Sequence, residues 1–345
     1  MISLNLFCFM KNYSFLLFFL SISCLSQSKN YFVYHSLINK AEELFFVQNK
    51  LDSSLYYYEK VFSDYDFIFV KDLVNASQIA FYSKKPYKKY IKQAFEQGLK
   101  IDYLSEIPLF KNEYKKLILD KVLNDVFLEN RKKYLAKIDI EYRDFTYDLG
   151  INDQKNKHLK GGAYDVKKHE SIIKLNKKIE IKGFPGDKIV GIADATIFKE
   201  LKSKYKDFYE RFKNDKLLKS YFTSNDEALS EQLIMCVLIH EFSSFSNSYL
   251  NSIWLKEIKK GNIHPRDVAL LHDNTYRSDY ASLTKIKGYY LNNIFAPYIK
   301  RNINRKDINN KRKNLHIVSL EVDEKKKEFE VFHGFKLFTG FFNGR

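Results

Sequence analysis

Four polar residues are the strongest candidates for chemistry: His240, Asp273, Asp153 and Gln154. His240 lies near the end of a long apolar stretch, and Asp273 follows a shorter one. A histidine beside an aspartate can act as a general base whose ring is oriented by the carboxylate. His240, Asp273 and Asp153 could alternatively hold zinc or a harder cation. A third interpretation is a buried His–Asp hydrogen bond that only ties helices together.

Other types of reactive site find less support in the sequence. Ser244 stands where a second zinc-binding histidine would follow His240 on a helix. The sequence has no glycine-rich phosphate loop and no nucleophile elbow. Cys236 lies in an apolar run, which favours a small core residue over a catalytic thiol. Whether the protein is an enzyme, and which cofactor or metal it uses, therefore stays open.

The helix that carries His240 is the best defined in the sequence. Ser224 and Glu227 form a capping box, and residues 228–242 are apolar on nearly every face. This pattern predicts a central, buried helix. We expect His240 to be buried there with Asp273 or Asp153 as its polar partner, because an unpaired buried polar group costs roughly 1–3 kcal/mol.

The elements around these residues are also predicted to be helical. Residues 167–182 are expected to form a helix that ends at Gly183, and residues 196–212 a second one. Pro265 can open the helix that leads to Asp273. Residues 289–295 continue helically.

Short motifs in this region together resemble a bacterial domain of unknown function. The resemblance covers residues 145–275. It rests on Asp153-Gln154 followed by Lys157, the turn Gly183-Phe184-Pro185 leading to Val190-Gly191, His240, and Gly261-x-Ile263-x-Pro265 leading to Ala269-x-x-x-Asp273. This chain has Asn274 where the family has arginine. Because the domain has no known function, the resemblance implies no reaction.

Residues 35–100 repeat at a period near 35, so that Ala41 corresponds to Ala76 and Phe46 to Phe81. Each unit is predicted to form two short helices, with small residues among aromatic ones. The period and layout resemble tetratricopeptide repeats. Residues 104–135 are expected to cap the stack. The repeats could bind a protein or peptide partner, or they could be a rigid spacer that docks the second domain.

The first 26 residues are typical of a signal peptide. Lys11 precedes an apolar run, residues 14–23, that is too short to span a bilayer. Small residues before Gln27 predict cleavage after residue 26. An alternative is a lipoprotein acylated on Cys24. No later run is long enough to be a transmembrane helix, so we expect an exported protein of the periplasm or cell envelope.

The net charge is +16, and the excess lies almost entirely after residue 130. A basic domain can bind an anionic glycan or lipid. Nucleic acid is not an expected partner of an exported protein. Lysine, asparagine, isoleucine, phenylalanine and tyrosine share AT-rich codons, so genome composition also accounts for the bias.

The expected fold is mainly α-helical. We predict a signal peptide (1–26), a tetratricopeptide-like repeat domain (30–135), a helical domain of unknown function (140–298) and a basic linker with a β-hairpin (299–345). Alternating residues 315–322 and 329–338 are the predicted strands. The favoured function is a binding or scaffold protein. The alternatives are an envelope hydrolase using His240 and Asp273, and a basic module for anionic glycan or lipid.

Overall fold

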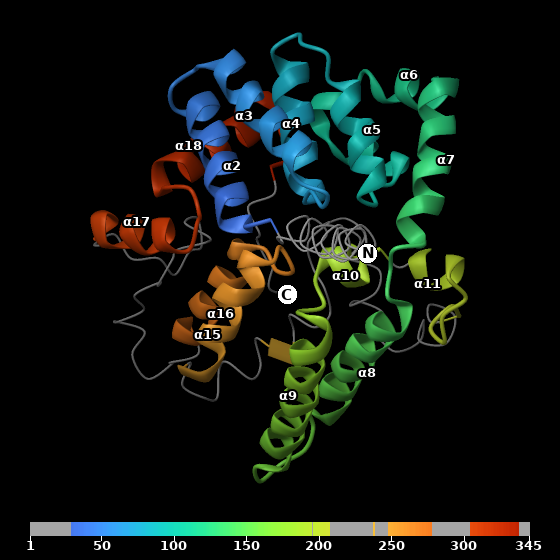
Figure 1. Cartoon of the computed structure of the whole chain (residues 1–345), viewed down its shortest axis with the longest axis vertical. Helices are drawn as coiled ribbons and strands as arrows, with labels where there is room; N and C mark the ends of the chain where they lie inside the picture. Colours follow the sequence, from blue (N-terminus) through green and yellow to red (C-terminus); the bar gives the residue numbers. More distant parts are fainter. Residues whose placement is uncertain (1–28, 195, 208–236, 239–247, 278–303, 338–345) are drawn as a thin grey trace, which may run out of the picture. The chain divides into compact units, whose positions relative to one another are not determined.

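A computed structural model describes residues 29–194, 196–207, 237–238, 248–277 and 304–337. All the regular elements within these ranges are helices, so the predicted mainly α-helical fold is confirmed (Figure 1). None of the helices in the described ranges is both long and apolar enough to cross a membrane.

The N-terminal region consists of two helical hairpins (Figure 1). Their helices are α2 (Tyr31–Phe46), α3 (Leu51–Asp64), α4 (Val70–Tyr82) and α5 (Lys88–Glu96). α2 packs against α3 and α4 against α5. Ala41 and Ala76, which correspond in the predicted repeat, are both completely buried. Small side chains at such positions let paired helices approach closely. The relationship to tetratricopeptide repeats stays a prediction.

In the segment that follows α5, an N-cap residue divides one apolar stretch into two helices. The segment comprises the 3-10 helices η1 (Ile101–Glu106) and η2 (Pro108–Phe110), then α6 (Tyr114–Leu119) and α7 (Lys121–Leu135). Asp120 separates α6 from α7, and its side chain accepts a hydrogen bond from the backbone N–H of Leu123 at 3.1 Å. This N-cap starts a new helix inside a continuous apolar pattern. α7 then packs against α5.

The middle of the chain forms a third hairpin from α8 (Ile140–Asn156) and α9 (Ala163–Lys182). α9 ends at Gly183, as predicted, and the φ of +84° at this residue suits glycine. Two short helices follow, α10 (Asp187–Val190) and α11 (Thr196–Glu200). The helix predicted over residues 196–212 was placed too long, because turns follow Glu200 up to residue 207.

Four further helices are described: α15 (Ser248–Lys259), α16 (Pro265–Arg277), α17 (Arg305–Asn314) and α18 (Leu320–His333). Pro265 is the first residue of α16, as the sequence predicted. The capping box at Ser224, the helices predicted over residues 228–242 and 289–295, and Cys236 lie outside the described residues, apart from the buried Val237 and Leu238.

The predicted C-terminal β-hairpin was wrong. Its expected turn, residues 323–328, is the middle of α18. Lys325 pairs with Glu328 at 2.7 Å and Lys327 with Glu330 at 2.9 Å, both at the i,i+3 spacing of a helix. Gly334, at a φ of +72°, ends the helix. These local helix signals outweigh the alternation that predicted strands.

The C-terminal segment packs on the first hairpins (Figure 1). Phe329 contacts Phe45 and Phe46 at centroid distances of 5.3 and 5.2 Å. The amide of Gln78 donates to the Lys336 carbonyl at 2.9 Å and accepts from its N–H at 2.7 Å. The described residues from Tyr31 onward thus belong to one compact unit. Contacts cross the predicted boundaries near residues 140 and 299, which stay predictions.

Candidate functional site

The predicted site residues belong to different parts of the fold. His240 lies outside the described residues, so its burial and its partner stay predictions. Asp153 and Gln154 are buried on α8. The Asp153 carboxylate accepts from Gln154 Nε2 at 2.9 Å and from the Tyr164 hydroxyl at 2.8 Å. These contacts hold the α8–α9 hairpin together.

Asp273 lies on α16. Burial lowers the pKa of Arg312, and the negative charge of Asp273 partly offsets this by raising it. The described contacts therefore place Asp273 and Asp153 in separate clusters. Within the described ranges, no three histidine, cysteine or acidic side chains are arranged to hold a metal ion. The acid–base and metal hypotheses for His240 stay untested.

The two glycine-containing motifs meet at a buried junction. Glu257 Oε2 accepts from the Phe184 N–H at 2.6 Å and from Asn262 Nδ2 at 2.8 Å. A Cβ atom at Gly186 would lie 2.0 Å from the carbonyl oxygen of Asn262, so the two backbones touch there. The motifs thus join α9 to the α15–α16 turn. Glu257, the acceptor at the centre of this junction, was not predicted from the sequence.

The Val190-Gly191 motif has a structural explanation as well. The Arg143 guanidinium, completely buried, donates to the carbonyls of Val190 at 2.7 Å, Ile192 at 2.9 Å and Asp194 at 2.9 Å. Gly191 adopts a φ of +76° inside this loop. The loop therefore wraps around a fixed positive charge rather than presenting a free site.

Three buried polar residues, His35, Lys71 and His264, gather around Phe69, and together with the half-buried Asp267 we call them the histidine–lysine cluster. The rings of His35 and His264 lie 5.0 Å apart and nearly perpendicular. They contact Phe69 at 5.4 and 4.9 Å, and Lys71 Nζ lies 5.7 Å from its centroid. His264 and Asp267 belong to the segment that carried the sequence motif, whereas nothing in the sequence predicted that His35 would join them.

Burial and neighbouring charge both shift the pKa values of the cluster residues. Burial lowers the pKa values of His35 and His264 well below their usual range, and the charge of Lys71 lowers them further. Both rings are therefore neutral near pH 7. Burial raises the pKa of Asp267, which Lys71 partly offsets. Such perturbed groups gather at functional sites more often than elsewhere.

Buried ion pairs lock the helices beside this cluster. Asp323 on α18 receives two hydrogen bonds from Arg266, at 3.0 and 2.6 Å, and another from Arg312. Lys326 Nζ lies 2.5 Å from a carboxylate oxygen of Glu42, and both side chains are almost fully buried. These pairs tie α16, α17 and α2 to α18, and they are structural.

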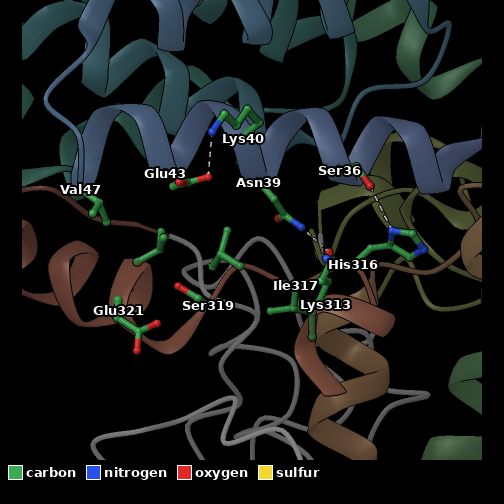
Figure 2. Close-up of a pocket in the computed structure, with 12 residues that line it drawn as sticks. Ser36, Asn39, Lys40, Glu43, Val47, Lys313, His316, Ile317, Ser319 and Glu321 are labelled. Atoms are coloured by element: carbon green, nitrogen blue, oxygen red, sulfur yellow. Dashed lines mark hydrogen bonds and ion pairs between the residues drawn. The ribbon is translucent and has the colours of Figure 1, made fainter. Parts of the chain in front are cut away.

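A half-open pocket of about 470 Å³ lies between α2 and the residues that link α17 to α18 (Figure 2). Asn39 bridges its two walls by donating from Nδ2 to the His316 carbonyl at 2.8 Å. The His316 ring stacks on Phe32 at 4.5 Å. A φ of +59° at His316 turns the chain here, in a segment predicted to be a strand.

Ser36 and His316 form a serine–histidine pair at the edge of the pocket, with 3.1 Å between Oγ and Nδ1 (Figure 2). The Ser36 hydroxyl donates its proton to the Phe32 carbonyl at 2.8 Å. His316 must then donate to Oγ rather than accept from it, so the pair is not arranged as a nucleophile and its base. The pocket is therefore suited to binding rather than to acyl transfer.

Comparison with known proteins adds no relative from which a role could be transferred. The resemblances to tetratricopeptide repeats and to a domain of unknown function accordingly stay predictions. The chain matches no family model, no curated protein and no solved structure.

Proposed function

We propose that this protein is an exported binding protein of the cell envelope that holds a peptide in the pocket beside α2. The pocket itself is the observation that carries the proposal. Its volume of about 470 Å³ falls within the range of about 300–1,000 Å³ that is typical of small-ligand sites. One wall comes from the first predicted repeat, the region expected to dock a partner.

The lining of the pocket suits a peptide because it combines three kinds of contact. Lys40 and Glu43 supply opposite charges in a pair 3.1 Å apart. Lys313 is exposed and makes no ion pair with any described residue, so it is available to a ligand carboxylate. Aliphatic side chains, among them Val47 and Val322, complete the lining. A peptide with an acidic or carboxyl-terminal group matches this combination.

Filling the pocket should weaken peptide binding. Val47 lines the pocket and is 48% exposed, so Val47→Trp adds bulk there without disturbing the core. Val33 lies on α2, which ends just before Val47. It is 49% exposed and does not line the pocket, so Val33→Trp is the matched control. We expect Val47→Trp to weaken binding by at least about tenfold, or 1.4 kcal/mol, and Val33→Trp to leave it unchanged.

The measurement is fluorescence anisotropy with a library of labelled hexapeptides that carry a free carboxyl terminus. Peptides selected with the full chain are then titrated against both variants. Equal losses in the two variants, or a library that contains no saturable binder, would contradict the proposed function.

Export is tested separately. We expect the native host to release a chain that begins at Gln27, since small residues precede it and an apolar run lies upstream. Mass spectrometry of the N-terminus decides this. A cytosolic chain that keeps Met1 or Met10 would argue against export, and an acylated Cys24 would indicate a lipid-anchored form.

A further inference from the structure

The histidine–lysine cluster contains a buried polar atom that the described part of the chain leaves unsatisfied. His35 Nε2 is fully buried and has no hydrogen-bond partner. Lys71 is 3% exposed, and it makes no ion pair with a described residue. By contrast, the buried Lys326 has Glu42, and Arg266 has Asp323. An unsatisfied buried group costs roughly 1–3 kcal/mol, and more when it is charged. The cluster is therefore incomplete without something bound.

The hydrogen-bonding pattern indicates what that ligand must be. His264 Nδ1 accepts from the backbone N–H of Arg266 at 3.2 Å. A neutral ring that accepts at Nδ1 carries its proton on Nε2, so His264 offers a donor. The Lys71 ammonium has only donors. The ligand must accept hydrogen bonds, which favours an anion over a metal cation.

The helix ends around the cluster favour an anion as well. Lys71 is the second residue of α4, and His264 immediately precedes α16. The N-terminus of a helix carries a partial positive charge, which attracts anions and disfavours a lysine. Two such ends therefore add to the charge of Lys71. A bound negative group would offset the unfavourable charge of a lysine buried at this position.

The neighbouring carboxylates have other partners or raised pKa values. Asp72 accepts from the Tyr34 hydroxyl at 2.7 Å, and burial raises its pKa to about 6. Asp267 also has a raised pKa because of burial. Glu42 and Asp323 are already paired with Lys326, Arg266 and Arg312. None of these carboxylates makes an ion pair with Lys71 within the described part of the chain.

We propose that His35, Lys71 and His264 form a binding site for a small oxyanion, with inorganic phosphate and acetate as its simplest representatives. Lys71 supplies the charge, and the two imidazoles, whose rings lie 5.0 Å apart beside Phe69, supply directed hydrogen bonds. This site is separate from the peptide pocket, which lies beside the residues that link α17 to α18, and neither proposal depends on the other.

Isothermal titration of the full chain with phosphate and, separately, with acetate at constant ionic strength tests the site. We expect saturable binding of one anion per chain, weakened by at least about tenfold in Lys71→Met. The control is Lys89→Met. Lys89 also lies over an aromatic ring, that of Tyr90 at 4.9 Å, but it already pairs with Glu59. Its removal should leave binding unchanged.

The outcomes separate the ligand classes. Binding of phosphate alone assigns the site to a phosphoryl group, and binding of acetate assigns it to a carboxylate. Equal losses in Lys71→Met and Lys89→Met would show only a general attraction to a basic protein and would overturn the site.

A second measurement does not require the variant to fold. In histidine-selective ¹⁵N NMR of the unsubstituted chain, the Nε2 resonances of His35 and His264 should shift on saturation with the anion. Resonances that stay fixed at millimolar anion would also overturn the proposal.

Discussion

Asp323→Asn should strongly destabilise the fold. The change keeps the shape of the side chain but removes the carboxylate that pairs with two buried guanidinium groups, those of Arg266 and Arg312. Breaking a buried ion pair in this way typically lowers the free energy of unfolding by roughly 3–5 kcal/mol. Urea denaturation followed by circular dichroism measures the change.

The control lies on the same helix. Glu324 pairs with Arg305, and both side chains are 41% exposed, so Glu324→Gln should lower the free energy of unfolding by less than about 1 kcal/mol. If Asp323→Asn loses no more stability than Glu324→Gln, the buried ion pairs do not hold α16 and α17 to α18.

Acid should reproduce the effect of the substitution. Burial alone raises the pKa of Asp323, but the charges of Arg266 and Arg312 outweigh it and hold the pKa well below its usual range. A carboxyl with a lowered pKa in the folded state contributes its full stability above the ordinary value of about 4, and loses it as the pH falls further. The stability difference between the native chain and Asp323→Asn should therefore shrink in acid.

Lys326→Met should have the second largest effect. It leaves the Glu42 carboxylate buried, and among the described residues only the Asn75 amide, 3.4 Å away, then donates to it. We expect a loss of roughly 3–5 kcal/mol in the free energy of unfolding. The double variant Glu42→Gln/Lys326→Met has no unpaired charge and should recover much of that loss. Urea denaturation of the full double-mutant cycle measures this coupling. Additive losses would mean that the pair contributes no interaction energy.

Local signals in the sequence predicted local structure well. Pro265 fixes φ at the start of α16, and Gly183 permits the positive φ at the end of α9, so both positions could be predicted from the residue type. The error over residues 315–338 was also local. Alternating apolar residues were given more weight than a charged run whose lysines and glutamates pair along a helix.

The sites could not be predicted because they join distant residues. His35 meets His264 through tertiary packing alone, and no periodic pattern links them. Ser36 reaches His316 across 280 positions of sequence. The motifs that suggested chemistry, such as Gly183-Phe184-Pro185, fill a packed junction with Glu257 instead. Close backbone approach requires particular residues as strictly as catalysis does.

The docking of α18 and Lys336 on the first hairpins also determines when the chain can finish folding. Glu42 and its partner are 284 positions apart, and Gln78 and Lys336 are 258 apart. Closing such long loops is slow, and it cannot occur before the last helix has been synthesised. Until α18 docks, the first hairpins consequently expose to water an apolar face and the Glu42 carboxylate, both of which are buried in the folded protein. The proposed export would benefit from this delay, because a chain that has not finished folding can still be threaded through a membrane.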